Sequence, residues 1–246
     1  MLKLLGSSLK WLSLSLLVLF ISVNANRLHE SYLLDYIGNQ VVMVTNGNGG
    51  GTGFHVEAPS GDVYILSNRH VCAVKDDNNF VTIITQDGRS HKKKVIKEYK
   101  KHDLCLIEPV RGYSGLELTE QNDLHSKLYI VGHPGLRPLT LSSGHYIGDD
   151  TISISSPNVE KKNCNGKFEK IPENSLEYFF FGLQSICVNY FDSYMTDAPV
   201  YGGNSGSPMV DARGNVWGVV FAKSMNAVHN GYIVPIDFVK DFLKKY

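Results

Sequence analysis

Short runs rich in Val, Ile, Tyr, Phe and Thr follow one another through residues 40–234, and they restrict the fold more than any other feature. Gly, Asn, Asp and Pro interrupt these runs at short intervals. Such runs between turn-forming residues are typical of the strands of a β-sandwich or a β-barrel. We expect strands at residues 41–45, 52–58, 62–67, 80–86, 92–99, 103–108, 128–132, 138–147, 177–189, 208–211, 215–222 and 231–234.

The strands fall into two groups. A polar, sparsely patterned connection at residues 109–127 separates them, and residues 148–176 form a polar hairpin or loop excursion from the second group. Apolar residues at helical spacing predict a short helix over 29–37 and a C-terminal helix over 235–246. We therefore expect an all-β domain over 26–246, made of two packed β-barrels at about 40–110 and about 126–234.

The first 25 residues are expected to lie outside this domain. Lys3 and Lys10 precede an uncharged, mostly apolar run at 11–23, and Val23-Asn24-Ala25 offers small residues for a signal peptidase. This layout is typical of a secretory signal peptide. An uncleaved membrane anchor is the second interpretation and a buried helix the third, since a spanning helix needs about 20 apolar residues. A secreted, periplasmic or cell-envelope protein is expected.

Charge and cysteine content limit the functional classes. The chain carries 24 Lys and Arg against 24 Asp and Glu, so no basic excess indicates nucleic-acid binding. The four cysteines are too few for a disulfide scaffold. No Cys-x-x-Cys or His-x-x-x-His pair is present, so neither a metal site nor a cofactor is expected.

A serine among glycines is the strongest chemical signal. Residues 201–208 read Tyr-Gly-Gly-Asn-Ser-Gly-Ser-Pro, which places Ser205 beside three glycines. Glycines allow a sharp turn and leave backbone N–H groups available to stabilise an oxyanion. Taken alone, this segment also fits an ordinary glycine-rich turn. The Gly-x-Ser-x-Gly elbow of α/β-hydrolases does not occur.

A base and an orienting acid can be proposed for Ser205. His70 ends the strand-like run at 63–70, where a rigid scaffold can present a base on a loop. Asp103 opens the apolar run at 103–108, and an acid next to a buried strand needs a hydrogen-bond donor such as an imidazole. Each residue is weak evidence alone. The order His, Asp, Ser, with a barrel-sized β-rich segment on each side, is stronger.

With these residues in place, the chain resembles the trypsin-like, chymotrypsin-fold serine proteases, within them the HtrA/Do-like branch. The segment from Thr196 to Val210 carries the most specific match. The matching segments run in family order: GTGFHV (51–56), LSNRHV (66–71), HDLCLIEP (102–109), YIVGHPG (129–135), TLSSGHYIG (140–148), TDAPVYGGNSGSPMV (196–210), GNVWGVV (214–220) and GYIVPI (231–236).

The resemblance implies a serine endopeptidase. Ser205 would be the nucleophile, His70 the general base and acid, and Asp103 the residue that orients His70. The N–H groups of Gly203 and Ser205 would form the oxyanion hole. Asn204 stands where digestive proteases carry an acid, so activation through a new N-terminus is not expected. The peptide-binding module typical of HtrA proteins is also not expected, only the protease domain.

The resemblance also implies where the primary substrate pocket lies. Its floor would be Pro199 and Val200, and its wall would include Val220, Phe221 and Lys223. These residues offer no carboxylate, so a small or medium apolar side chain is favoured over Arg or Lys before the cleaved bond. If the Lys223 ammonium points inward, an acidic side chain is the alternative.

Three further features have plain interpretations. The glycine run at 47–53 is expected to be a hairpin turn, because it lacks the Gly-Lys-Ser/Thr ending of a phosphate-binding loop. The basic stretch at 91–102 is a solvated strand edge or, alternatively, a polyanion-binding patch. Cys72 and Cys105 are expected to be buried free thiols, with a mutual bridge as the alternative. Cys164 and Cys187 are expected to form a disulfide.

The expected function is thus a secreted or cell-envelope serine endopeptidase that acts on protein or peptide substrates. The alternative is a catalytically weak or inactive protease-fold module that binds peptides or polyanions. Membrane contact is expected only if residues 1–25 stay uncleaved, and the oligomeric state stays open.

Overall fold

A closed six-stranded barrel forms the first half of the protein. The computed structural model describes residues 2–73, 79–119, 127–158, 160–164, 166–223 and 231–246. The barrel order is β1-β2-β3-β6-β5-β4, all antiparallel. Apolar side chains such as Val44, Ile65, Ile83 and Ile107 fill it. Its strands are β1 (Val41–Thr45), β2 (Gly50–Glu57), β3 (Val63–Asn68), β4 (Phe80–Ile84), β5 (Ser90–Tyr99) and β6 (Leu104–Ile107).

A second, seven-stranded antiparallel sheet forms the other half. Its order is β13-β12-β11-β7-β8-β10-β9, and β13 also pairs with β10. That pairing joins six of the strands into a ring and leaves β9 on the outside. The expected two-barrel, mainly β fold is confirmed. The strands are β7 (Lys127–Gly132), β8 (Thr140–Pro157), β9 (Lys167–Lys170), β10 (Ser185–Thr196), β11 (Pro208–Val210), β12 (Val216–Lys223) and β13 (Gly231–Pro235).

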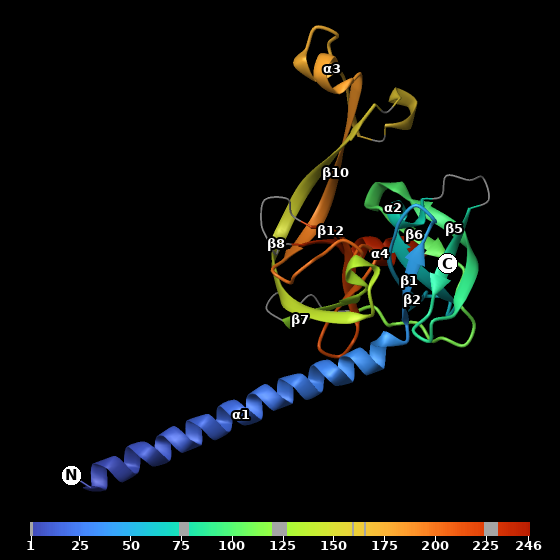
Figure 1. The fold of residues 1–246 in the computed structure, drawn as a ribbon. Coiled ribbons are helices and arrows are strands. Elements are labelled where there is room, and N and C mark those ends of the chain that lie inside the picture. Colours follow the sequence, from blue (N-terminus) through green and yellow to red (C-terminus); the bar gives the residue numbers. More distant parts are fainter. Residues whose placement is uncertain (1, 74–78, 120–126, 159, 165, 224–230) are drawn as a thin grey trace.

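The C-terminal helix α4 (Ile236–Leu243) helps to join the two halves. Its buried residues belong to a core cluster that also includes Phe54 and Leu106 of the first barrel and Val219 of the second. The Phe242 ring stacks on Tyr99 with centroids 5.2 Å apart. Figure 1 shows α4 between the two strand-rich bodies. The expected helix at the C-terminus is confirmed.

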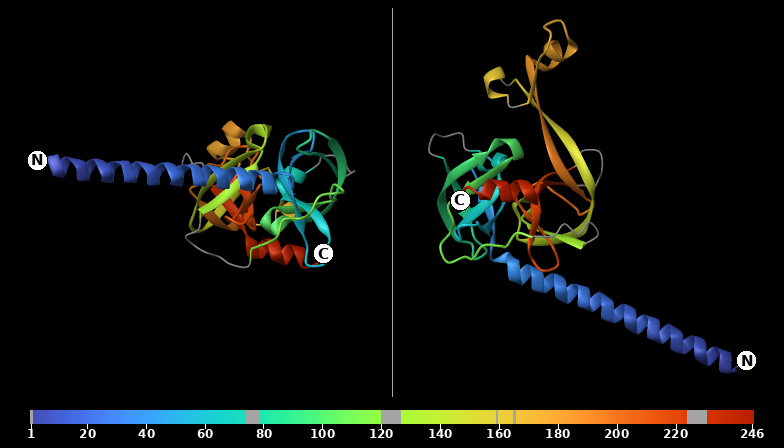
Figure 2. Two further views of the ribbon diagram at one scale, coloured as in Figure 1. Left: turned by 90° about the horizontal axis from the view of Figure 1, so that it is seen from below. Right: turned by 180° about the vertical axis from the view of Figure 1, so that it is seen from behind.

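Helix α1 (Leu2–Gly38) continues well beyond the protein body, as Figures 1 and 2 show. Its C-terminal part is anchored to the body: Leu33 and Ile37 are fully buried, and Glu30 pairs with Lys127 at 2.9 Å. The expected helix over 29–37 is therefore the docked end of a longer one. Among the residues that the structure describes, no helix is both long and apolar enough to cross a membrane. The signal peptide at 1–25 stays a prediction.

The excursion from the second barrel is a long hairpin, which we call the arm. β8 and β10 pair from Tyr146–Thr196 out to Pro157–Ile186 and carry β9, the 3₁₀ turn η3 (Lys161–Asn163) and helix α3 (Leu176–Phe181). The arm projects from the body in Figure 1. The strand expected from residue 177 is wrong at its start. Ser175 caps α3 by accepting a hydrogen bond from the Tyr178 N–H, and Gly182 ends it with a left-handed backbone.

Both cysteine pairs form disulfides. Cys164–Cys187 lies in the arm, as expected. Cys72–Cys105 corrects the expectation of free thiols: β3 pairs with β6, and the turn that follows β3 brings the two Cα atoms to 6.6 Å. The expected turn after β1 is also confirmed, since Asn46 N–H bonds the Gly49 carbonyl and β1 and β2 pair directly.

Candidate active site

His70 and Asp103 are brought together by the pairing of β3 with β6. The register places Asn68, the last residue of β3, opposite Leu104, the first residue of β6. His70, in α2 (Arg69–Cys72) just after β3, therefore lies near Asp103, just before β6. The His70 Nδ1 lies 2.6 Å from Asp103 Oδ2, and the His70 N–H donates to Asp103 Oδ1 at 3.0 Å. The carboxylate therefore fixes both the ring and the backbone of the histidine.

Asp103 is held in a costly backbone conformation. It ends the 3₁₀ turn η1 (Lys100–His102) with φ 53° and ψ 40°, a left-handed conformation that is uncommon outside glycine. Its carbonyl accepts hydrogen bonds from the Arg69 N–H at 2.8 Å and the Asn68 amide at 3.1 Å. A strained conformation persists where surrounding contacts determine it, and it is most often found at functional sites.

Ser205 lies on a turn between β10 and β11 that both barrels support. Its carbonyl accepts from the Thr52 N–H of β2 at 2.8 Å, and the Gly206 N–H donates to Val220 of β12 at 2.8 Å. Gly203 and Gly206 have φ of 95° and 86°, and a Cβ on either would collide with backbone atoms. Glycine is therefore required on both sides of the serine.

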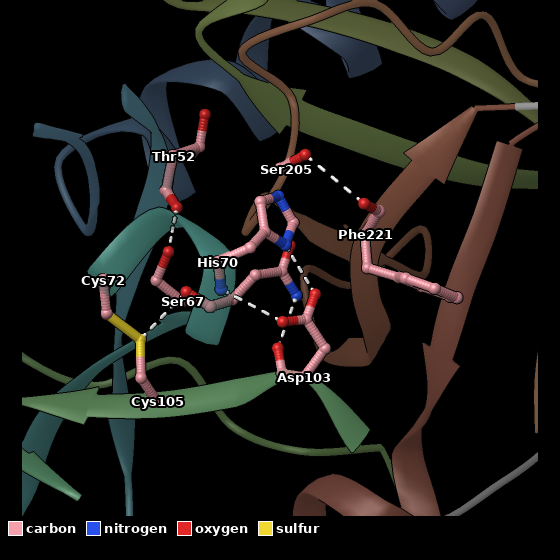
Figure 3. Close-up of polar contacts among 9 residues, drawn as sticks. Thr52, Ser67, His70, Cys72, Asp103, Cys105, Ser205 and Phe221 are labelled. Carbon is pink, nitrogen blue, oxygen red and sulfur yellow. Dashed lines mark hydrogen bonds and ion pairs between the residues drawn. A yellow bond between two sulfur atoms is a disulfide. The ribbon is translucent and has the colours of Figure 1, made fainter. Parts of the chain in front are cut away.

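The serine and the histidine come from different barrels but face each other. Figure 3 shows the ring nitrogen of His70 that is not bonded to Asp103 turned toward Ser205. The Ser205 Oγ makes a long hydrogen bond of 3.4 Å to the Phe221 carbonyl. The His70 side chain is 48% exposed, so a ligand can reach this junction. All three residues expected from the sequence thus meet at one place.

Two backbone donors at this junction have no acceptor. Within the described part of the chain, the N–H groups of Gly203 and Ser205 make no hydrogen bond. Both residues are partly exposed, so these donors are available to a ligand at the junction. Next to a serine hydroxyl, such donors can stabilise negative charge on a substrate oxygen.

The residues expected to form the primary pocket have mixed environments. Val200 and Val220 are buried in the core of the second barrel, and Phe221 is also buried. Pro199 is half-buried and accepts a hydrogen bond from Ser142, whereas Lys223 is exposed. Whether they receive a substrate side chain stays a prediction.

Two other pockets border the arm. One of about 610 Å³ has aspartates among its lining residues, including Asp149, Asp192 and Asp237. The other, of about 360 Å³, is lined by residues of η1 and β10. Among the residues described, no group of three or more His, Cys, Asp or Glu side chains is arranged to hold a metal ion.

Sequence reasoning missed two supporting residues. The Thr52 hydroxyl donates to the Gly203 carbonyl at 2.8 Å and accepts from the His133 N–H at 3.0 Å, which ties the serine turn to both barrels. The His133 ring is buried, and this burial lowers its pKa although a hydrogen bond to the Arg137 carbonyl opposes the shift. The Gly-Thr-Gly motif at 51–53 was the available signal for Thr52.

This arrangement defines the class of chymotrypsin-fold proteases. One barrel carries a serine with two backbone N–H groups available beside it, and the other barrel carries a paired His and Asp. A family model described as a trypsin-like peptidase domain matches residues 51–219. The chain belongs to this family, as its sequence motifs led us to expect.

Curated relatives are HtrA-type proteins. The chain is 27% identical to the mitochondrial serine protease HTRA2 of Drosophila virilis over 86% of its own length and 42% of the relative's. It is 24% identical to a probable serine protease do-like of Buchnera aphidicola, over 78% and 34% of the two lengths. The chain thus spans about two fifths or less of the curated relatives it matches.

Solved structures share the fold. The active form of the Rv3671c protease from M. tuberculosis aligns with a TM-score of 0.63 at 21% identity, covering 87% of this chain and 83% of that one. A serine endoprotease from Yersinia pestis aligns with a TM-score of 0.60 at 17% identity, covering 88% and 66% of the two chains.

Proposed function

We propose that the protein is a serine endopeptidase that hydrolyses peptide bonds through an acyl-enzyme. The observation that carries the proposal is the meeting of three features at the junction of the barrels: the His70–Asp103 pair, the Ser205 hydroxyl and two unpaired backbone N–H groups. Family membership supports the same reaction class.

In the proposed reaction, the Ser205 hydroxyl leaves the Phe221 carbonyl and turns toward the His70 ring. His70 accepts its proton as Oγ attacks the substrate carbonyl carbon, and the Gly203 and Ser205 N–H groups stabilise the resulting oxyanion. Asp103 keeps the Nδ1 proton in place and stabilises the imidazolium. The leaving amine takes a proton from His70, and water then hydrolyses the ester by the same steps in reverse.

A second candidate function is a protease-fold module that binds peptides without cleaving them. One observation favours it: the Ser205 Oγ is bonded to the Phe221 carbonyl, not to His70. A bond of 3.4 Å is weak, and a rotation about one side-chain torsion replaces it. We therefore rank hydrolysis first.

Export to an oxidising compartment is part of the proposal. Its support is the charged, apolar and small-residue order of 1–25 together with two disulfides, which persist in secreted and envelope proteins. Identification of the N-terminal residue of the purified protein tests it: a start near Asn26 is expected, and a start at Met1 in the exported protein contradicts a cleaved signal.

A fluorophosphonate probe and a random peptide library test the activity together. We expect the wild-type protein to be labelled at Ser205 and to cleave the library, with a profile that disfavours Arg and Lys before the cut. Ser205→Ala should lower kcat by a factor on the order of 10⁶. Equal cleavage by Ser205→Ala would falsify the assignment, and stoichiometric peptide binding without cleavage by wild type would establish the binding module.

A further inference from the structure

The pocket between η1 and the arm is lined by two positive charges. Lys100 and Lys101 line it, and neither has a carboxylate partner in the portion of the chain that the structure describes. The two acids nearest in sequence are engaged elsewhere: Glu98 pairs with Arg69 at 3.0 Å, and Asp103 pairs with His70 at 2.6 Å. The other walls are aromatic or small, supplied by Tyr99, Tyr190, Phe191, Asn189 and Gly166. We call this the lysine pocket.

The lysine pocket adjoins the proposed catalytic groups from two sides. On one side, Lys100 and Lys101 lie in η1, the turn that ends at Asp103. On the other, the Phe191 ring lies 6.0 Å from the Phe221 ring, and the Phe221 carbonyl accepts the Ser205 hydrogen bond. An extended peptide advances about 3.3 Å per residue. These two links place the pocket beside the proposed catalytic groups, and we infer that a peptide lying across Ser205 reaches it within a few residues of the cleaved bond.

The size and lining of the pocket favour a side chain over a polymer. At about 360 Å³ it falls at the small end of ligand pockets, which suits one or two amino-acid residues. Aromatic rings can cover the apolar stem of a side chain while the two ammonium groups bind its charged end. A carboxylate is the complementary group.

We propose that the lysine pocket selects peptide substrates with Glu or Asp a few residues from the cleaved bond. The proposal rests on the proposed peptidase function and adds a substrate class to it. Because both lysines are solvent-exposed, each pairing is modest, and two of them give roughly a tenfold preference. The preference should shrink with added salt, as interactions of exposed charges do.

Matched peptides that differ only by Glu and Gln test the proposal. The pair is scanned through the positions on both sides of a fixed cleavage site, and kcat/KM is measured at about 0.05 M and about 0.5 M salt. We expect one or two neighbouring positions at which the Glu peptide has a kcat/KM about tenfold higher than the Gln peptide at low salt. The difference should lie in KM and not in kcat. If Glu is preferred over Gln at none of the scanned positions, the proposal is overturned.

Variants separate the pocket from general charge. Lys100→Ala with Lys101→Ala should reduce the Glu/Gln ratio to about one, and Lys100→Glu with Lys101→Glu should favour a Lys-containing peptide instead. The control is Lys92→Ala with Lys94→Ala, which removes the same charge from exposed positions of β5 outside the pocket. The control should keep the wild-type ratio. If both double variants lose the Glu preference equally and heparin displaces the Glu peptide, the lysine pocket is ruled out in favour of a polyanion-binding surface.

Binding measurements keep the two proposals distinguishable. Fluorescence anisotropy with Ser205→Ala measures the affinity for the Glu and Gln peptides without turnover. If wild type cleaves neither peptide but Ser205→Ala binds the Glu peptide more tightly, the peptidase function fails and the acidic preference stands. If cleavage is normal and the two affinities are equal, the acidic preference fails alone.

Discussion

Thr52 of the first barrel contacts two segments of the second barrel, including the turn that carries Ser205. It is fully buried, its hydroxyl bridges the Gly203 carbonyl and the His133 N–H, and its own N–H holds the Ser205 carbonyl. Replacing this hydroxyl with a methyl group leaves two buried backbone groups without partners. The turn that carries Ser205 should then lose its position.

We predict that Thr52→Val destabilises the protein by about 2 kcal/mol, the cost of leaving buried hydrogen-bonding groups unpaired. It should also lower kcat for any peptide substrate, because the serine turn loosens. Urea unfolding and steady-state kinetics measure the two effects. Thr52→Ser, which keeps the hydroxyl, is the control and should retain most of both properties. Equal stability of the two variants contradicts the bridging role.

At this scale the sequence identified the residues with unusual chemistry but not those that act through the backbone. His70, Asp103 and Ser205 could be found because their side chains suit a known reaction and their order fits a known family. The Phe221 carbonyl contacts Ser205 whatever its side chain is, so residue type gives no signal. The sequence interpretation assigned Phe221 to a pocket wall and missed that carbonyl.

Among the elements, strands were predicted well where an apolar run ends at a clear turn sequence. β1 runs from Val41 to Thr45, as expected, because a short run of valines and a methionine precedes a glycine turn. Residues 177–181 (EYFFF) were expected to begin a strand because aromatic residues favour strands. Capping by Ser175 and Gly182 favours a helix there. Burial in a sheet does not compete with the helix, because four of its side chains are 70–80% exposed: Leu176, Phe179, Phe180 and Phe181.

The disulfide Cys72–Cys105 connects the turn that carries His70 to the strand that follows Asp103. Each cysteine lies two residues beyond one member of the pair, and both are fully buried. We expect Cys72→Ala with Cys105→Ala to cost about 4 kcal/mol, as for a loop of this length, and to lower kcat more than it changes KM. Thermal unfolding and kinetics measure the outcome.

The second disulfide is a matched comparison for the first. Cys164→Ala with Cys187→Ala also removes one bridge, but from the arm. It should leave kcat for uncharged peptides close to wild type. If the two double variants lose kcat equally, the Cys72–Cys105 bridge has no special role in placing His70 and Asp103.

For the molecule as a whole, buried histidines link stability to pH. His55 lies in the first barrel, where its Nδ1–H bonds the Gln40 carbonyl and its Nε2 accepts from the Val110 N–H. Burial lowers the pKa of His55, and nearby Lys93 adds to this, although the Gln40 hydrogen bond opposes it. Burial likewise lowers the pKa of His133 and of His102. Each of these rings therefore stays neutral to a lower pH in the folded protein than in the unfolded chain.

Because the unfolded chain takes up protons near the ordinary histidine pKa and the folded protein does not, acid favours unfolding. The stabilisation is complete above that pKa and is lost as pH falls, so the free energy of unfolding should decrease between about pH 7 and about pH 5. Urea unfolding across this range measures it. His55→Asn should flatten the dependence, and a stability that rises toward acid pH contradicts the assignment of neutral rings.

The division of the site between the barrels has a consequence for biosynthesis. A ribosome completes residues 41–107, with His70 and Asp103 already able to pair, well before it makes Ser205 and the strand β12 that holds the Gly206 N–H. Because the chain is made from its N-terminus, an early product contains the His70–Asp103 pair but not Ser205. In the proposed peptidase, such a product cannot cleave neighbouring proteins until Ser205 and β12 have been made and have packed against the first barrel.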